Sequence, residues 1–500
     1  MRLLCLSKKL SHVPPLAWIL AAAIVCYGGS ALFQLGLYHD DWPVLEHMVF
    51  APRGFFSAMA ALAAGEPKQL LRPLSVPIFA ALYTAFGTWA AGWHLVGLAA
   101  NAWISWGLFR LARRYGVAEA PALAGALLFL GYPNKDSTYF WNIAGLNAYS
   151  LLFLVEALVA QADYAASGGR RRLIAAVSWF GACLASYDQS LLMAPVFLLA
   201  PGWKARRPPP RAVTGFLAAA AVTATYCGYK FGLAPRFAAE GRAMEFSLAR
   251  VPGLIRDAAA AQGGWNMWMA AWQGAVIALR AVPLVAAAGL LIPAAALIGR
   301  EDKSRVDSGL FALAAAVLVL SYAVFIPTSY PISPISHFNR LNNIGAFAVA
   351  LAAAGAAARV PRRLGARGLA ALAAACLAAH AGLALYWVVS AQMQERVRLI
   401  LMANLSSWPA RRALLVRPQA NMVFDRAPVF LESWDIGGAV HLWTGDRTRR
   451  AFVIRPGVVP APGGVILSNQ LAPYDTVTLL DARSATVQNA DPARVEALFQ

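Results

Sequence analysis

The sequence predicts an all-α polytopic membrane bundle of about 11 transmembrane helices with a small C-terminal periplasmic α/β domain. The first observation is composition. Hydrophobic residues make up 59% of the 500-residue chain and charged residues 13%, about half the charged share of a typical soluble domain. The second is arrangement. Up to about residue 390, the apolar residues form long Ala-, Leu- and Val-rich runs separated by short charged clusters, which is typical of helices that cross a bilayer.

The basic residues predict which side of the membrane each loop faces. The formal net charge is +19, and 20 of the 43 Lys and Arg residues fall in six short clusters, within 2–9, 110–114, 170–172, 204–211, 300–305 and 359–367. Loops that face the cytoplasm carry such an excess of basic residues. Because the clusters are short and separate, they offer no continuous basic groove, and the charge therefore argues against nucleic acid as a partner.

The clusters also fix the order of the spans. With the N-terminus in the cytoplasm, we predict spans at about 16–37, 92–110, 119–132, 148–166, 173–187, 190–203, 212–231, 282–299, 309–327, 344–358 and 369–390. The main outer loops are then 38–91, 133–147, 232–281 and 328–343. An odd number of spans places the C-terminus outside.

Two apolar stretches can each be interpreted in more than one way. The apolar run 16–37 is long enough to cross the bilayer, so we interpret it as an uncleaved anchor rather than a signal peptide. Residues 73–86 are also apolar, but they contain two prolines and no basic cluster follows them. We therefore predict an interfacial helix on the outer face, within the loop 38–91.

The sequence changes character after about residue 390. Residues 391–405 continue the last helix, and short β-type runs follow at 413–416, 428–432, 439–443, 451–454, 465–467 and 476–480. A final helix should begin after Asp491, with Pro492 in its first position. We therefore predict two domains, a transmembrane domain at 1–390 and a periplasmic α/β domain at 391–500, the second without a catalytic motif.

Two adjacent carboxylates, Asp40 and Asp41, directly follow the first predicted span. An acidic pair in an outer loop is often only solvated surface. Here the span fixes its position, aromatic residues flank it, and the apolar helices of the loop would wall a cavity. A carboxylate so placed can take a proton from an acceptor hydroxyl as a general base, and its neighbour can hold the acceptor, a metal or a cation. We predict both as catalytic residues.

The loop 133–147 is the second candidate. Asp136 adds a third carboxylate on the outer side, Lys135 could meet a phosphate, and Trp141 lies five residues after Asp136. Taken alone, this stretch is equally typical of a polar turn.

The third candidate is a set of residues in the other outer loops. Arg340 stands just before the span 344–358. A lone interfacial arginine usually reaches for headgroups, but one facing a cavity can bind a phosphate with two parallel hydrogen bonds. Arg72 is a cation of the same kind, and His337 lies close to Arg340 in sequence, although a loop histidine is more often structural. Asp188, between two short spans, could line the same cavity.

These residues together resemble a family. An Asp-Asp pair after one long span, the element Arg72-Pro73-Leu74 and the end of the next span at 111–116 are similar to the C-type polytopic glycosyltransferases, which include the protein O-mannosyltransferases and the lipid A aminoarabinose transferases. Tyr132-Pro133, the Asp136 loop with Trp141, and an arginine before a late span also fit. The resemblance covers about residues 15–345, through short and degenerate motifs.

The resemblance implies a polyprenyl-phosphate-sugar donor and an inverting transfer, on the periplasmic side, to a glycan, lipid or protein hydroxyl. It implies that Asp40 is the general base and that Asp41 and Asp136 orient acceptor or donor. It also implies that Arg340, with Lys135 or Arg72, neutralises the departing lipid phosphate. Relatives with Asp-Glu in place of Asp-Asp leave open which carboxylate is the base. No cofactor is indicated by a motif, and the need for a divalent cation stays open.

Two other functions compete with this one. A transporter or flippase of a lipid-linked sugar should place its polar residues at the bilayer midplane, whereas most of those here are expected at the outer face. A non-catalytic envelope assembly protein would not need the Asp pair. The sequence thus favours a multi-pass glycosyltransferase of the bacterial inner membrane, and it names neither the sugar nor the acceptor.

Overall fold

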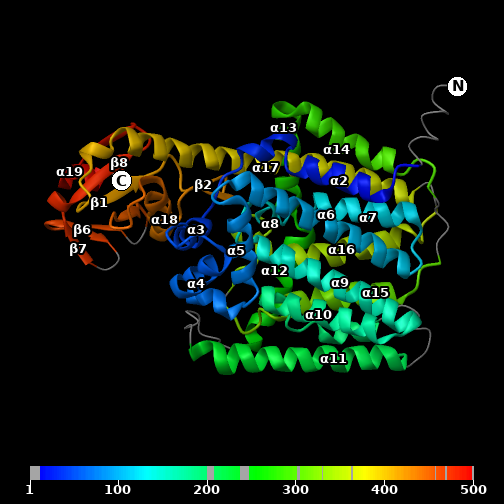
Figure 1. Ribbon diagram of the computed structural model, residues 1–500. Helices are drawn as coiled ribbons and strands as arrows, with labels where there is room; N and C mark the ends of the chain where they lie inside the picture. The colour runs from blue at the N-terminus through cyan, green and yellow to red at the C-terminus, as the bar shows by residue number, and fades with distance from the viewer. Residues whose placement is uncertain are drawn as a thin grey trace.

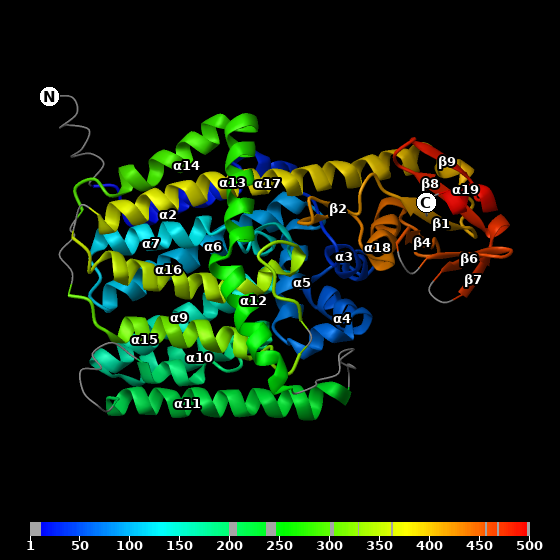
Figure 2. The same ribbon diagram turned by 180° about the vertical axis from the view of Figure 1, so that it is seen from behind.

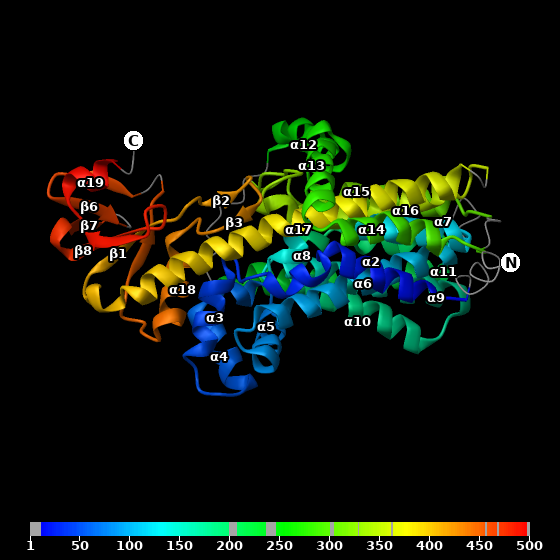
Figure 3. The same ribbon diagram turned by 90° about the horizontal axis from the view of Figure 1, so that it is seen from above.

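The computed structural model describes residues 12–497, with gaps at 200–207, 237–246, 301–304, 329, 362–363, 456–457 and 468–469. Long helices lie side by side in a bundle, and a smaller domain lies beyond one end of it (Figure 1). The helix α17 (Gly365–Ala403) runs along the bundle and continues into the smaller domain (Figure 3). The described chain is therefore mostly helical with a small C-terminal sheet region, as the sequence predicts.

Nine of the predicted spans coincide with one helix each among the described residues. These helices are α6 (Ala90–Arg114), α7 (Glu119–Gly131), α9 (Gly145–Ser167), α10 (Arg170–Ser186), α11 (Pro210–Cys227), α14 (Pro283–Ala296), α15 (Gly309–Ala323), α16 (Asn343–Ala357) and α17. Four described helices are long and apolar enough to cross a membrane: α6, α9, α17, and α11 with its continuation to Arg236. The predicted number of eleven spans is not confirmed. The basic residues before residue 10, and those at 204–207, 303 and 362–363, lie outside the described part of the chain.

The first predicted span is wrong beyond Cys26. The helix α2 (Pro15–Cys26) ends there because Gly28 and Gly29 take positive φ values of 71° and 62°, which glycine adopts without a steric penalty. A 3-10 helix, η1 (Gly29–Gln34), follows. The chain thus leaves the helix well before the acidic pair, and the apolar run that suggested one long span contains a bend.

The outer loops contain more helix than the sequence suggests. Residues 38–91 form α3 (Asp41–Val49), α4 (Phe55–Gly65), η2 (Pro67–Leu71) and α5 (Ser75–Phe86), of which α5 confirms the predicted helix at 73–86. The loop predicted at 232–281 instead contains η7 (Leu248–Arg250), α12 (Val251–Gly263) and α13 (Trp265–Ala281). Three shorter segments that were predicted without helix also contain one: α8 (Ser137–Phe140), η3 (Asp188–Ser190) and η8 (His337–Asn342).

The span predicted at 190–203 is also wrong for its described part. Residues 194–199 form a 3-10 helix, η4 (Ala194–Leu199), with Pro195 near its start, and residues 200–203 lie outside the described chain. Proline lacks the N–H that an α-helix interior needs, which favours the shorter turn here.

The helix α13 crosses the long helices at a steep angle (Figure 2). Small residues make this crossing close. A Cβ placed on Gly382 of α17 would overlap the carbonyl oxygen of Gly274 in α13, and a Cβ on Gly274 would lie 2.5 Å from the carbonyl oxygen of Ala379. Small residues at such crossings let helix backbones approach and gain dispersion contacts. The prediction of a loop missed this because no long apolar run marks α13.

The C-terminal domain is built on a four-stranded sheet in the order β4-β1-β8-β9. The strand β1 (Ala413–Arg417) pairs in parallel with β4 (Ala451–Val453) and β8 (Val477–Asp481), and β9 (Thr486–Asn489) pairs with β8 in antiparallel fashion. Residues 413–416 are all buried, because both faces of the parallel part are covered. Smaller hairpins are β2 (Met422–Val423) with β3 (Ala427–Pro428), and β5 (Val459–Ala461) with β6 (Gly464–Leu467) and β7 (Gln470–Pro473).

The predicted strands are confirmed at 413–416, 451–453, 465–467 and 477–480, as is the final helix, α19 (Pro492–Ala497). The strand predicted at 439–443 is wrong, because these residues lie in α18 (Ser433–Thr444). A capping box between Glu432 and Asp435 starts this helix, and Gly445 in the left-handed conformation ends it. Of the run 428–432, only Pro428 lies in a strand.

The close crossing predicts a difference between two glycines of α17. Gly382→Ala should lower the free energy of unfolding by about 1–3 kcal/mol, because the added methyl group overpacks the contact with α13. The matched control is Gly368→Ala, where a Cβ meets nothing within 4 Å and alanine favours the helix. Thermal unfolding of the purified variants in detergent measures both. Equal midpoints for the two variants would contradict the crossing.

Candidate functional site

The acidic pair lies where η1 leads into α3. Asp40 is the residue before the first turn of α3, and its side chain is 39% exposed. Asp41 is the first residue of the helix and is buried. Between the bundle and this pair stands His39, with a φ of 47°, a conformation that few non-glycine residues adopt and that often marks a functional site. One carboxylate of the pair thus faces solvent and the other faces the protein.

Asp41 joins the start of α3 to the loop before α9. Its carboxylate accepts hydrogen bonds from the backbone N–H of Tyr38 (3.0 Å) and Ile143 (2.9 Å) and from the side chain of Asn142 (3.1 Å). Burial raises the pKa of Asp41 to about 7, against the effect of these hydrogen bonds. A carboxylate with these partners holds two segments in register.

Asp40 shares a cluster with two residues of the C-terminal domain. Trp434 donates from Nε1 to Oδ1 of Asp40 over 3.1 Å. Nε2 of His39 lies 3.8 Å from the same oxygen, while its Nδ1 lies 2.8 and 2.9 Å from the two oxygens of Asp435. The imidazole of His39 therefore lies between two carboxylates, one half-exposed and one completely buried.

The charges in this cluster depend on one another. Burial disfavours the imidazolium form of His39, but the carboxylates of Asp40 and Asp435 outweigh it, so the pKa of His39 is raised. Burial raises the pKa of Asp435 despite the nearby imidazole. The two carboxylates thus favour the protonated form of His39.

The same cluster could hold a metal ion. Ligand atoms of His39, Asp40 and Asp435 all lie within 4.8 Å of one another. Imidazole nitrogen and carboxylate oxygen suit a divalent cation such as zinc or manganese. The nitrogen Nδ1 of His39 already bonds to Asp435. Such an ion would therefore use Nε2 of His39 together with carboxylate oxygens of Asp40 and Asp435.

Asp136 lies deeper, where four segments meet. Its Oδ2 accepts from Nε1 of Trp387 in α17 (2.9 Å), and its Oδ1 accepts from Nη1 of Arg426 (3.1 Å) and from the side chain of Asn339 in η8. Arg426 and Asp136 are both almost completely buried. Arg426 comes from the loop between β2 and β3, in the C-terminal domain, next to Asp425 with a φ of 55°.

Lys135 points away from Asp40, into the bundle. The side chain is fully buried, Nζ donates to the hydroxyl of Tyr139 over 2.9 Å, and it lies 4.0 Å from the ring centroid of Phe129. Burial lowers the pKa of Lys135 well below its usual value. The structure therefore places Lys135 apart from the other cations that the sequence selects.

Arg340 and the acidic cluster are linked through Trp141. The guanidinium carbon of Arg340 is 4.8 Å from the Trp141 ring centroid, and the Trp141 ring is 5.1 Å from the ring of His39. Nη1 of Arg340 donates to the carbonyl oxygen of His337 over 2.8 Å. Burial, together with the charges of Arg340 and His39, lowers the pKa of His337 to about 3, so this imidazole is neutral at pH 7.

Arg72 and Lys230 are further cations in the same region of the site. The guanidinium of Arg72 lies 4.2 Å from the Tyr187 ring centroid. Despite burial, which acts in the opposite direction, the positive charges of Arg72 and Arg340 lower the pKa of Tyr187. Asp188 then binds Arg72 (3.5 Å) and Lys230 (2.6 Å). Burial opposes ionisation of Asp188, but these two cations hold its pKa below the usual range.

Apart from Lys135, most of the sequence-predicted residues form one chain of contacts. It runs from Asp40 through His39 and Trp141 to Arg340, and on by way of Tyr187 to Arg72 and Asp188. Asp136 joins it through Asn339, the neighbour of Arg340 in sequence. The chain begins at the Asp40 carboxylate, and the guanidinium groups of Arg340 and Arg72 lie between Trp141 and the carboxylate of Asp188.

Several members of the site were missed by sequence reasoning. No sequence signal assigns a role to His39, which directly precedes the acidic pair, or to Tyr187. Trp434, Asp435 and Arg426 come from a domain in which no catalytic motif was found. The only sequence signal for Asp435 is its place in the capping box, and that signal predicts a helix start rather than a site.

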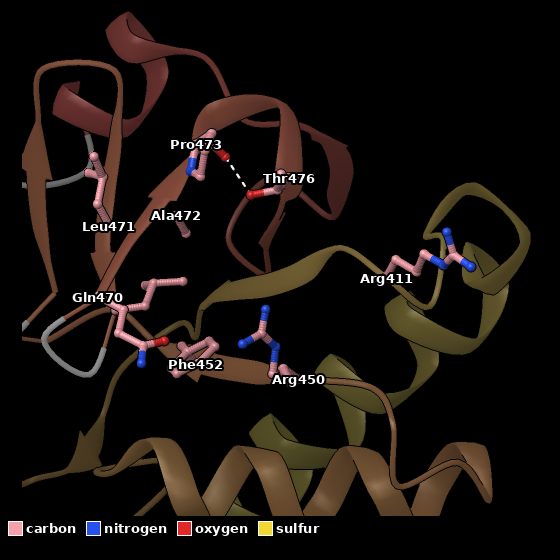
Figure 4. Close-up of a pocket in the computed structure, with 9 residues that line it drawn as sticks. Arg411, Arg450, Phe452, Gln470, Leu471, Ala472, Pro473 and Thr476 are labelled. Carbon is pink, nitrogen blue, oxygen red and sulfur yellow. Dashed lines mark hydrogen bonds between the residues drawn. The ribbon is translucent and has the colours of Figure 1, made fainter.

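A separate groove lies in the C-terminal domain, with a volume of about 400 Å³ (Figure 4). Arg411, Arg450, Phe452 and Gln470 are among the residues that line it. The guanidinium of Arg450 lies beside Phe452 and Gln470, whereas that of Arg411 points away from them (Figure 4). The groove thus brings no pair of cations onto one ligand position.

No protein-family model matches the chain, and no curated protein matches it. The chain is similar to the crystal structure of ArnT from Cupriavidus metallidurans in the apo state, with 14% identity and a TM-score of 0.38, over 82% of this chain and 84% of that one. The structure of the same protein bound to undecaprenyl phosphate aligns with 14% identity and a TM-score of 0.35, over 87% and 88%.

The raised pKa of Asp41 predicts a pH dependence of stability. The folded carboxyl group binds its proton more tightly than the unfolded one, so its contribution is full below about pH 4 and is lost as pH rises through about 7. The loss amounts to a few kcal/mol, since one pKa unit corresponds to about 1.4 kcal/mol. Unfolding midpoints between pH 4 and pH 8 should fall less steeply for Asp41→Asn than for the wild type. Asp257→Asn, at an exposed residue of α12, serves as the control. Equal slopes in all three proteins would contradict the assignment.

Proposed function

We propose that the chain is a membrane glycosyltransferase that moves a sugar from a polyprenyl-phosphate-linked donor to an acceptor hydroxyl on the periplasmic side. One observation carries the proposal: the buried ring of Trp141 lies 5.1 Å from the ring of His39, the neighbour of the half-exposed carboxylate Asp40, and 4.8 Å from the guanidinium carbon of Arg340. Such a transfer needs a base for the acceptor and a cation for the departing phosphate, at the two ends of one sugar.

The reaction is a single displacement. The acceptor oxygen attacks the anomeric carbon and its proton passes to the carboxylate of Asp40. The bond from the anomeric carbon to the phosphate oxygen breaks, and the electron pair stays on the lipid phosphate. Because the acceptor enters opposite to the leaving group, the configuration at the anomeric carbon inverts.

The cations then take the charge that develops on the phosphate. Arg340 and Arg72 share contacts with Tyr187, so both can meet one phosphate group. Asp188, which also binds Lys230, holds Arg72 in place. We assign the phosphate to these two arginines rather than to Lys135, whose Nζ lies among aromatic rings.

In this proposal, the carboxylates of Asp40 and Asp41 have different roles. Asp40 is the base because its side chain reaches solvent, whereas Asp41 holds the loop that carries Trp141. If a divalent cation takes part, His39, Asp40 and Asp435 are the residues that would hold it. The proposal includes a bacterial inner-membrane location, a cytoplasmic N-terminus and a periplasmic C-terminal domain.

Loss of the base should abolish transfer while leaving the fold intact. We expect Asp40→Asn to lower the transfer rate by about 10²–10⁴-fold, the usual contribution of a general base. Its unfolding midpoint should stay near that of the wild type, because the side chain is half-exposed. Purified protein in nanodiscs, given membranes of a deletion strain as the source of donor and acceptor, allows mass spectrometry of the new glycan. Full activity of Asp40→Asn would contradict the general base.

Arg340 should be needed to hold the phosphate. With undecaprenyl phosphate as the probe, Arg340→Gln should bind about 10–100-fold more weakly, since a hydrogen bond to a charged group contributes about 1.5–3 kcal/mol. The control is Arg398→Gln, which removes an exposed arginine paired with Glu395 on α17. Unchanged affinity of Arg340→Gln would move the phosphate away from this group.

A further inference from the structure

We propose that α18 of the C-terminal domain is part of the catalytic centre: Trp434 directly, and Asp435 through His39, are positioning residues for the base Asp40. This inference rests on the proposed function and extends it to a helix in which the sequence shows no catalytic motif. Neither residue needs to touch the sugar. Each acts on the orientation of the carboxylate that takes the acceptor proton.

The first contact is direct. Trp434 donates from Nε1 to Oδ1 of Asp40 over 3.1 Å, and half of its side chain is exposed. Among the described residues, Oδ2 of Asp40 accepts no hydrogen bond. The indole therefore fixes one oxygen of the carboxylate and leaves the other for an acceptor hydroxyl, which is the arrangement that general base catalysis requires.

The second contact runs through His39. Asp435 is completely buried, and its Oδ2 also accepts from the backbone N–H of Leu431 (3.0 Å) and Glu432 (3.1 Å). With its carboxylate fixed in this way, Asp435 bonds to Nδ1 of His39 and thereby turns Nε2 toward Asp40, 3.8 Å away. A buried acid that orients an imidazole through Nδ1 sets the direction of its other nitrogen.

The backbone around His39 is fixed by its surroundings, as its ring is. The φ of His39 is 47°, and its neighbour Tyr38 is fixed at both ends, by its N–H on Asp41 and by its hydroxyl on the carbonyl oxygen of Trp387 (2.7 Å). Such a backbone conformation persists only where the surroundings enforce it. The positive φ brings the imidazole between α3 and α18 instead of leaving it in solvent.

The two helices that meet here are packed closely. A Cβ placed on Gly438 of α18 would lie 2.8 Å from the backbone nitrogen of Pro43 in α3, so the two backbones are in near contact. Glu46 of α3 binds Nδ1 of His441 (2.9 Å) and Nε of Arg447 (3.0 Å) beyond that contact. The close contact at Gly438 and the ion pairs of Glu46 thus fix α18 on α3. Trp434 and Asp435 contact Asp40 and His39 at one end of this interface.

The test compares Trp434→Phe and Asp435→Asn with controls in the same domain, in the nanodisc assay described for Asp40. Trp408→Phe loses an indole bond to the carbonyl oxygen of Arg412, and Asp446→Asn loses an exposed carboxylate. We expect both α18 variants to lower the initial rate about tenfold, because small displacements of a catalytic group are costly. The two controls should retain the wild-type rate. Trp434→Phe should keep the wild-type unfolding midpoint, since the residue is half-exposed.

The split between kcat and KM separates positioning from stability alone. A displaced base slows the transfer step without weakening acceptor binding, so Asp435→Asn should lower kcat with KM near the wild-type value, whereas Asp446→Asn should change neither. Wild-type kcat and KM in both α18 variants would overturn the inference. If Asp40→Asn is inactive in that case, the proposed function stands and only the role of α18 fails. If Asp40→Asn is active, the general base itself is wrong.

Discussion

The buried carboxylate of Asp136 holds the site together. Its two oxygens meet donors from α17, from η8 and from the C-terminal domain, while its own backbone belongs to the loop between α7 and α9. An ion pair such as Asp136 with Arg426, withdrawn from water, is stable only when its remaining hydrogen bonds are also made. Asp136 therefore ties together the segments that carry Trp141, Arg340 and Arg426.

This constraint explains why the bundle and the C-terminal domain act as one unit. Arg426 fixes the hairpin between β2 and β3 on the bundle, and the contacts of Glu46 fix α18 on α3. The chain returns to the acidic pair almost 400 residues after leaving it, and Asp435 then approaches His39 to within hydrogen-bond distance. Residues from both ends of the sequence therefore surround the base Asp40.

Much of the fold follows from the sequence because long apolar runs and basic clusters carry simple physical signals. Nine predicted spans lie on helices, and the sheet core at 413–416 and 477–480 is marked by its apolar runs. The failures have local causes. Gly28 and Gly29 end α2 early, and α13 packs through small residues that no hydropathy pattern reveals. For the site, Asp40 and Arg340 stood out because charge at the end of a span is rare. Asp435 did not, since only the docking of α18 on α3 brings it near Asp40.

The central claim is that Asp40 is the base and Arg340 the phosphate-binding cation for one sugar. The most direct measurement is an experimental structure with undecaprenyl phosphate bound. The account predicts the phosphate within hydrogen-bond distance, about 3 Å, of the guanidinium of Arg340. A phosphate bound elsewhere, with Arg340 still stacked on Trp141, would contradict it.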